Sequence, residues 1–372
     1  MDGDHDRGRD GRRAGRVGAT GRRAGVRRIL KPAIAVAAVV LAAFLLHRTL
    51  SNYSAAELAA AVVAVPWTRL AGAAGFAAAS YLCLTGFDYL GLRYAGRPLA
   101  YRRAALTSFT SLSLGHNIGF AALSSGAVRY RFYSRWGLDA ADVGRVILFC
   151  GATVGLGLMT LGGMALLAMS ETASGLTGLG RTTVLALGAA NLALVGAYLA
   201  LAGFRHAPFR LWRWETEIPS LRLASAQVAV GAANFTFVAA CLHQATAAVA
   251  DVPFLGVASV FVIANVTALV SHVPGGWGVI ETVVARLLPG ADVIGAILVF
   301  RIVYYLVPLG LGGAALAVSE LVLRRAKETD GGEERAAAQK TPSPADLRTR
   351  PRGRARAGSA CGGSGVLDRE AG

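Results

Sequence analysis

Charged residues are scarce in this sequence and unevenly placed. Asp, Glu, Lys and Arg make up 16% of the 372 residues, and the long apolar stretches contain few of them. The four cysteines show no zinc or redox spacing, and we find no nucleophile motif, metal-ligand spacing or P-loop. These absences count against an enzyme that acts by itself, and they predict neither a metal nor a cofactor.

Apolar residues dominate instead: they make up 54% of the chain, and the mean hydropathy is +0.49. Crossing a ~30 Å hydrocarbon core takes ~20 mostly apolar residues. The composition therefore predicts an all-α, multi-pass membrane protein with six full spans. They are expected at 29–47, 68–90, 142–169, 182–203, 223–249 and 293–320. The segment after the first span, "RTLSNYSAAEL", lacks a convincing cleavage site, so we do not interpret that span as a signal peptide.

The formal charge of +16 comes largely from two Arg-rich tails. We expect 1–28 and 324–372 to be disordered and cytoplasmic, flanking a transmembrane domain at 29–323. Basic residues near anionic headgroups contribute ~1 kcal/mol each to membrane attraction. Membrane attraction is therefore favoured over nucleic-acid binding as the reason for the charge.

Basic loops predict the topology, because Lys and Arg concentrate on the cytoplasmic side. Both termini are then cytoplasmic, in a bacterial-type inner membrane. The apolar stretch 104–126 conflicts with a full crossing, since it would place Arg129, Arg131 and Arg135 outside. We therefore expect a re-entrant hairpin that enters from the cytoplasm and turns near His116. Such backbone is tolerated where protein or a water-filled cavity covers it.

A second re-entrant hairpin is expected at 254–290, entered from the opposite side, if the final span is to end inside. This makes eight hydrophobic segments in all. The alternative is that 254–272 and 276–290 are two crossings, which gives eight spans, although the second would be short.

The two predicted hairpins share a short motif. His116 begins "HNIG" and His272 begins "HVPG", and the same interval relates the spans around them. The segments 68–169 and 223–320 are thus candidate repeats of opposite orientation, which in transporters place a site near the membrane midplane. Chance similarity between Ala/Gly-rich spans is the alternative.

Polar and helix-breaking residues inside the apolar segments are the candidate site. An ionised side chain costs at least ~2.5 kcal/mol at a helix centre in a membrane, so such residues usually face a cavity or each other. Structural alternatives are an Asp88–Arg93 pair, a Glu281 pair with Arg286 or Arg301, and histidines that cap broken helices. The predicted headgroup path consists of Asp88, His116, Asn117, Arg129, Arg131, His272, Pro274, Gly275, Gly276, Gly278, Glu281, Arg286 and Arg301.

The break in the second hairpin has a direct chemical cause. Pro274 removes a backbone donor, and the two glycines that follow it allow backbone angles that other residues resist. A half-helix beginning near Gly278 would present free N–H groups and a partial positive charge suited to a phosphate. Trp277, Tyr304 and Tyr305 could line the passage, or simply pack or anchor at the interface.

Several ordered motifs resemble a known family. "SYLCLTGFDYLGLRY", "GAVRYRFYSRWGL", "HVPGGWGVIETVVARLL" and "FRIVYYLVPLGLGGAAL" resemble the YbhN-like proteins, which share the transmembrane domain of the lysylphosphatidylglycerol synthases (the multiple peptide resistance factor). The resemblance covers roughly residues 29–323, with P-G-G-x-G-x-x-E at Pro274–Glu281 the most specific part. In the synthases this domain is regarded as a flippase for aminoacylated phospholipid. The chain after Glu320 is too short and too polar for their soluble catalytic domain.

The resemblance implies a protein that moves or handles a phospholipid, such as phosphatidylglycerol or its aminoacylated form, without catalysis of its own. Two alternatives stay open. One is a membrane subunit or partner of a lipid-modifying synthase, and the other is a small-solute transporter, which the repeat suggests without the family.

Overall fold

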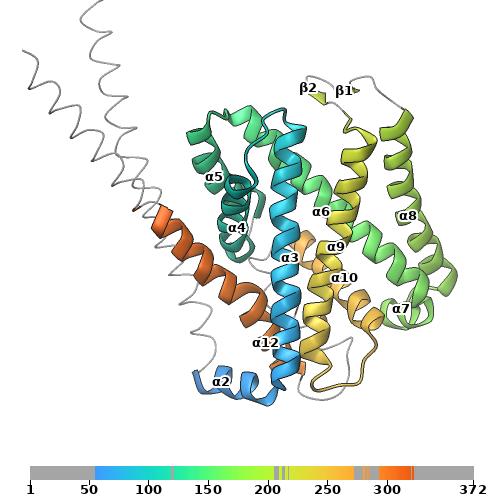
Figure 1. Ribbon diagram of the computed structural model, residues 1–372. Coiled ribbons are helices and arrows are strands. Elements are labelled where there is room, and N and C mark those ends of the chain that lie inside the picture. Colours follow the sequence, from blue (N-terminus) through green and yellow to red (C-terminus); the bar gives the residue numbers. More distant parts are fainter. Residues whose placement is uncertain are drawn as a thin grey trace, which may run out of the picture. The chain divides into compact units, whose positions relative to one another are not determined.

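The computed structural model describes residues 55–118, 121–204, 209–211, 214–216, 218–271, 280, 283–284, 293–319 and 321. All of these except Leu321 belong to one compact unit, Met1–Glu320. Nearly all of the described chain is helical, which confirms the all-α class (Figure 1). The helices are α2 Ala55–Ala64, α3 Trp67–Tyr94, α4 Tyr101–Ile118, α5 Ala121–Tyr133, η1 Ser134–Trp136, α6 Ala140–Ala168, α7 Ser170–Thr177, α8 Arg181–Phe204, α9 Leu221–Thr246, α10 Phe254–Ser271, α12 Val293–Arg301 and the π-helix η3 Ile302–Leu306.

The exception to the all-α class is a small β-hairpin between α8 and α9. Strand β1 (Phe209–Leu211) pairs antiparallel with β2 (Trp214–Thr216), with Arg210 opposite Glu215. The chain from the end of α8 to the start of α9 is rich in arginine, with Arg205, Arg210, Arg213 and Arg222.

Five helices of the described residues are long and apolar enough to cross a membrane. They are α3, α6, α8, α9 and the segment Gly295–Ser319, which we call the final span; it contains most of α12, all of η3 and the helical residues 307–319. Each coincides with a predicted span, which confirms that these five stretches form apolar helices of spanning length. The predicted span at 29–47 lies outside the described residues.

Helix α8 is the clearest candidate for contact with lipid. Leu187, Leu194 and Leu201 are exposed and recur every seven residues, so they form one stripe along the helix. An apolar stripe of this kind would be unfavourable in water but suits a hydrocarbon surrounding. The described chain is therefore that of a multi-pass membrane protein.

The stretch predicted as a re-entrant hairpin, 104–126, is not a continuous helix. Helix α4 ends at Ile118, α5 begins at Ala121, and the two helices pack against each other. The 13 residues of α5 span about 20 Å at ~1.5 Å per residue, which is less than the ~30 Å hydrocarbon core. The break falls just after His116, where the sequence predicted it.

Both ends of this hairpin lie at the same end of the bundle (Figure 1). Just before α4, Arg97 Nε is 3.0 Å from Asp142 Oδ2 in the first turn of α6. The guanidinium of Arg103 in α4 lies 5.4 Å from the ring centre of Trp136, which follows α5. The chain therefore returns to the end from which it entered, as a re-entrant hairpin requires.

Helices α3 and α9 pack side by side and run antiparallel. As the residue number increases along α3, the number of the residue it contacts on α9 decreases. In order, Phe76 stacks on Phe237 with ring centres 6.3 Å apart, Ser80 Oγ donates to Asn234 Oδ1 at 2.8 Å, and Gly86 faces Val230.

The contacts around this pair agree with the predicted inverted repeat. Ser80 and Asn234 are 154 residues apart and lie near the middle of their helices, as equivalent residues on a two-fold axis would. Helix α4 packs on α3 as α10 packs on α9, and α6 packs on α3 as α12 packs on α9. The repeat itself stays a prediction.

Glycine allows α6 and α9 to approach each other closely. A Cβ at Gly157 of α6 would lie 2.5 Å from the backbone of Gly231 in α9. Small residues of this kind let membrane helices approach until their backbones touch.

The second predicted hairpin is described in part. Helix α10 spans 254–271, and its apolar part, 254–269, is shorter than a full crossing. The predicted turn at 272–279 lies outside the described residues. The choice between six and eight spans therefore stays a prediction.

Candidate functional site

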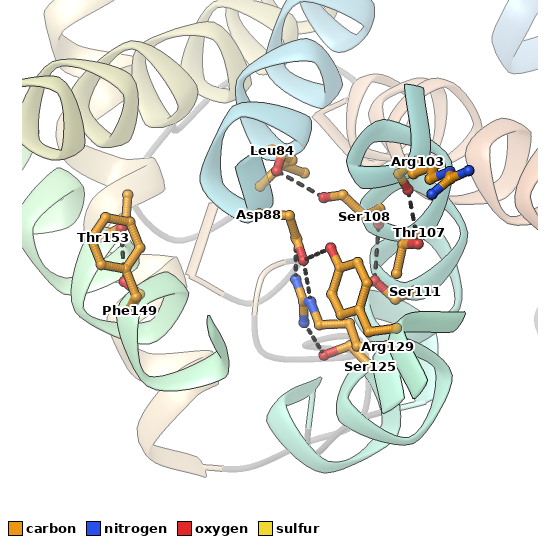
Figure 2. Close-up of polar contacts among 11 residues, drawn as sticks. Leu84, Asp88, Arg103, Thr107, Ser108, Ser111, Ser125, Arg129, Phe149 and Thr153 are labelled. Carbon is orange, nitrogen blue, oxygen red and sulfur yellow. Dashed lines mark hydrogen bonds and ion pairs between the residues drawn. The ribbon is translucent and has the colours of Figure 1, made fainter. Parts of the chain in front are cut away.

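A buried ion pair joins α3 to α5 (Figure 2). Arg129 Nε and Nη2 donate to the two carboxylate oxygens of Asp88, each at 2.8 Å, and both side chains are at most 3% exposed. The two parallel hydrogen bonds form the bidentate geometry that Arg makes with carboxylates and phosphates. The sequence predicted both residues as part of one path, and the structure brings them together.

Two neighbours complete the hydrogen bonding of this pair. The Tyr133 hydroxyl donates to Asp88 Oδ1 at 2.8 Å, and Arg129 Nη1 donates to Ser125 Oγ at 2.8 Å. Ser125, Arg129 and Tyr133 recur at intervals of four on α5, so one face of this helix carries all three. We call Asp88, Ser125, Arg129 and Tyr133 the carboxylate–guanidinium cluster.

The alternative pairing of Asp88 with Arg93 is wrong. Arg93 Nη2 donates to the Tyr89 hydroxyl at 2.6 Å, and its guanidinium lies 4.5 Å from the centre of that ring. Asp88 is fully buried, whereas Arg93 is exposed on the next turn of α3. The two side chains thus point to different surroundings, because five residues along a helix is more than one turn.

A second polar cluster surrounds His116, near the end of α4. Its ring centre lies 6.3 Å from that of Tyr81 on α3, and 6.4 Å from those of Tyr304 and Tyr305 on η3. Nδ1 of His116 is buried and has no hydrogen-bond partner. This nitrogen does not form the cap that the structural alternative proposed; instead Asn117 Nδ2 donates to the backbone oxygen of Ser113 at 2.9 Å.

The aromatic side of this cluster comes from the π-helix η3. A π-turn widens a helix locally and is common at functional sites. Arg301, just before η3, is 1% exposed, and its guanidinium lies 5.5 Å from the ring centre of Tyr305. Two of the aromatic residues predicted to line the passage, Tyr304 and Tyr305, thus lie beside His116.

The Tyr304 hydroxyl connects the His116 cluster to the centre of the bundle. It shares a 3.0 Å hydrogen bond with Ser80 Oγ, which also donates to Asn234. Tyr81 adds a hydrogen bond to the Tyr304 backbone oxygen at 3.3 Å. Polar groups from α3, α9 and the final span therefore meet in the interior.

Other predicted residues are not part of these contacts, or cannot be placed. Arg131 lies on α5, partly exposed, two residues after Arg129. The predicted residues of the second hairpin lie outside the described residues, so neither their role nor the pairing of Glu281 is tested. They are His272, Pro274, Gly275, Gly276, Trp277, Gly278, Glu281 and Arg286.

Sequence reasoning missed Ser125, Tyr133 and Ser80, which complete the two clusters. Ser125 and Tyr133 could have been found as the i−4 and i+4 neighbours of Arg129 on a helix. Ser80 carried no such signal, because its partners Asn234 and Tyr304 are more than 150 residues away.

No group of three or more His, Cys, Asp or Glu side chains in the described part of the chain could hold a metal ion. The described cysteines, Cys83, Cys150 and Cys241, are free and lie within apolar helices.

No protein-family model matches the sequence. The chain is 30% identical over 314 residues to an uncharacterized protein of Synechocystis sp., an alignment that covers 83% of this chain and 98% of the relative. It is 28% identical over 247 residues to the inner membrane protein YbhN of Escherichia coli, with 64% of this chain and 76% of the relative covered. With its apolar spans and these relatives, the chain belongs to the YbhN-like family of membrane proteins.

Proposed function

We propose that this protein moves a phospholipid between the leaflets of a cytoplasmic membrane, with phosphatidylglycerol or an aminoacylated derivative as its substrate. The proposal involves no covalent chemistry. Both termini lie in the cytoplasm, as the basic loops predict. The two hairpins line a polar route along which a headgroup crosses while the acyl chains stay in lipid.

The observation that carries the proposal is the carboxylate–guanidinium cluster. An ion pair that is at most 3% exposed lies in an apolar bundle, where it joins α3 to a helical hairpin that enters and leaves at one end. Burying two charges costs several kcal/mol per ion, and an equally well packed apolar pair is often as stable. Stability alone therefore does not require charges here, and ionisable residues inside membranes usually mark substrate or ion pathways.

The geometry of the pair also suits an anionic headgroup. A phosphate presents two oxygens to a guanidinium in the same bidentate way as a carboxylate. Arg129 can therefore exchange Asp88 for a lipid phosphate without changing its own hydrogen-bond pattern. In the absence of lipid, Asp88 keeps the guanidinium paired and the hairpin closed.

The experiment is reconstitution of the purified protein in liposomes. Labelled phosphatidylglycerol, native or lysylated, should change leaflet faster than in empty vesicles, and a dithionite or back-extraction assay measures the rate. Arg129→Lys keeps the positive charge but cannot form two parallel hydrogen bonds to one phosphate, so it should slow translocation. The matched control is Arg97→Lys, at an arginine whose side chain is 55% exposed and pairs with Asp142 at the bundle end.

Three outcomes separate the functions. A lipid-specific acceleration that Arg129→Lys slows and Arg97→Lys leaves intact supports the proposal. Equal rates with and without protein contradict it and favour a partner of a lipid-modifying synthase. Uptake of a water-soluble solute without lipid movement would favour a solute transporter.

A further inference from the structure

Helix α4 carries an unusual number of buried hydroxyl groups. Most of those that are paired donate to backbone oxygens: Thr107 to Arg103 at 2.9 Å, Ser108 to Leu84 at 2.8 Å, and Ser111 to Ser108 at 3.0 Å. In contrast, three buried polar atoms of α4 have no hydrogen-bond partner. They are Thr110 Oγ1, Ser113 Oγ and His116 Nδ1.

These three residues follow each other at intervals of three, which places them on one face of the helix. That face is turned toward the final span. A Cβ at Gly312 would lie 2.6 Å from Ser113 Cβ, and the rings of Tyr304 and Tyr305 flank His116. We call Thr110, Ser113 and His116 the open polar face of α4, because their polar atoms lack partners.

The open polar face of α4 is buried, so its unpaired polar atoms are difficult to explain by packing alone. Thr110 and Ser113 are completely buried, and Ser113 Oγ lies near the Tyr81 hydroxyl without a hydrogen bond of normal geometry. An unpaired buried hydroxyl loses its bonds to water and gains nothing, so valine or alanine would pack better. Unpaired buried polar atoms therefore point to a partner that binds at another stage.

The position of the face relates it to the carboxylate–guanidinium cluster. Helix α4 packs against α5, which carries Arg129, and both helices contact α3: Ser108 donates to the Leu84 backbone oxygen at 2.8 Å, one turn from Asp88. From Thr110 to His116 the face extends about 9 Å along the helix at ~1.5 Å per residue. A glycerol headgroup next to a phosphate is of this size.

We propose that the open polar face of α4 binds the hydroxyl groups of a phospholipid headgroup when α4 separates from the final span, while Arg129 takes the phosphate. The inference rests on the proposed function and adds which part of the protein selects the lipid headgroup. The face offers two hydroxyls and an imidazole nitrogen and no carboxylate or guanidinium, so it matches uncharged hydroxyls. In this structure the final span closes against the face, with Gly312 allowing the close approach.

The first test compares two lipids of equal charge in liposomes containing the protein. Phosphatidylglycerol and phosphatidylpropanol both have a three-carbon headgroup, but the second lacks the hydroxyls. The unchanged protein should translocate phosphatidylglycerol at least several-fold faster. The variant Thr110→Val/Ser113→Ala should lose that preference and move both lipids at the phosphatidylpropanol rate.

Stability distinguishes this role from a structural one. Because the two hydroxyls have no partners, Thr110→Val/Ser113→Ala should melt at a temperature no lower than the unchanged protein. The matched control, Thr107→Val/Ser108→Ala, removes hydroxyls that donate to backbone oxygens. It should melt lower and keep the preference for phosphatidylglycerol. A lower melting temperature with an intact preference in the first variant would overturn the inference.

A second measurement is independent of transport. With the natural cysteines replaced, Ser113→Cys should react with a small water-soluble thiol reagent whenever the face opens, whereas Ser108→Cys, on the side toward α3, should react far more slowly. If the protein moves both lipids at equal rates and Ser113→Cys stays unreactive, the face is not part of the route. If the unchanged protein moves neither lipid, the proposed function fails instead, whatever the labelling.

Discussion

Replacing Asp88 by asparagine should strongly destabilise the protein. The change removes the charge that neutralises Arg129 and keeps the size of the side chain. Asp88 accepts three hydrogen bonds, two from Arg129 and one from Tyr133, and it is fully buried. Breaking a buried ion pair by removing one partner typically costs about 3–5 kcal/mol, because the other charge stays buried and uncompensated. Solvent cannot screen this pair, so we expect a loss in that range.

A second substitution should reverse most of the loss. In Asp88→Asn/Arg129→Gln both charges are gone, so no uncompensated charge stays buried. The melting temperature of each variant in detergent is measured by heating samples and quantifying the remaining folded protein by size-exclusion chromatography. Arg97→Gln is the matched control. That control removes an arginine that is 55% exposed and leaves its partner Asp142 paired with Arg145, so we expect a clearly smaller loss.

Among these variants, the rate of lipid translocation should not rise and fall with the melting temperature. The double variant should fold but translocate poorly, because glutamine cannot pair with a phosphate as a charged fork does. Two results would refute the reasoning: an Asp88→Asn protein as stable as the unchanged one, or a double variant that is no more stable than Asp88→Asn. Either would mean that the ion pair is not formed, or not isolated from water, in the membrane.

Three further predictions concern other parts of the chain. Cysteines introduced at Arg93 and Arg135 should be labelled only from the cytoplasm in intact cells, because Arg93 lies in the last turn of α3 and Arg135 in η1, both within basic segments; labelling of position 135 from outside would make 104–126 a true crossing. Gly157→Leu should lower the melting temperature markedly, at a cost of about 2 kcal/mol or more, since its Cβ would lie 2.5 Å from the Gly231 backbone; unchanged melting would mean that α6 and α9 do not cross there. Glu281→Gln should insert at normal levels and lose translocation if Glu281 belongs to the site, whereas a drop in abundance with normal specific activity would make it a structural residue.

Most of the architecture was predictable from the sequence because membrane spans depend on local composition. The five spans of the described chain match apolar stretches that can be seen without knowing any long-range contact. The packing of α5 back against α4 was also predictable, since Arg129, Arg131 and Arg135 could not lie outside without violating the charge bias. Both inferences use only residues within one segment and its flanks.

The candidate site was predictable in its members but not in its pairs. Asp88, His116 and Arg129 were recognised because polar groups are costly in hydrocarbon. Their partners depend on the relative rotation and depth of separate helices, which hydropathy does not encode. The structural alternative therefore paired Asp88 with nearby Arg93, whereas its partner Arg129 is 41 residues away on α5.

The sequence by itself thus determined that the chain is a multi-pass helical membrane protein and which of the described stretches are long apolar helices, because hydrophobic length and loop charge act locally. Only the tertiary structure decided that Arg129 neutralises Asp88, that Ser80 meets Asn234 at the crossing of α3 and α9, and that Thr110 and Ser113 are buried without partners. The physical reason is that a helix satisfies its own backbone hydrogen bonds but not its polar side chains. Their partners come from whichever helix packs beside them, and packing is a property of the whole bundle.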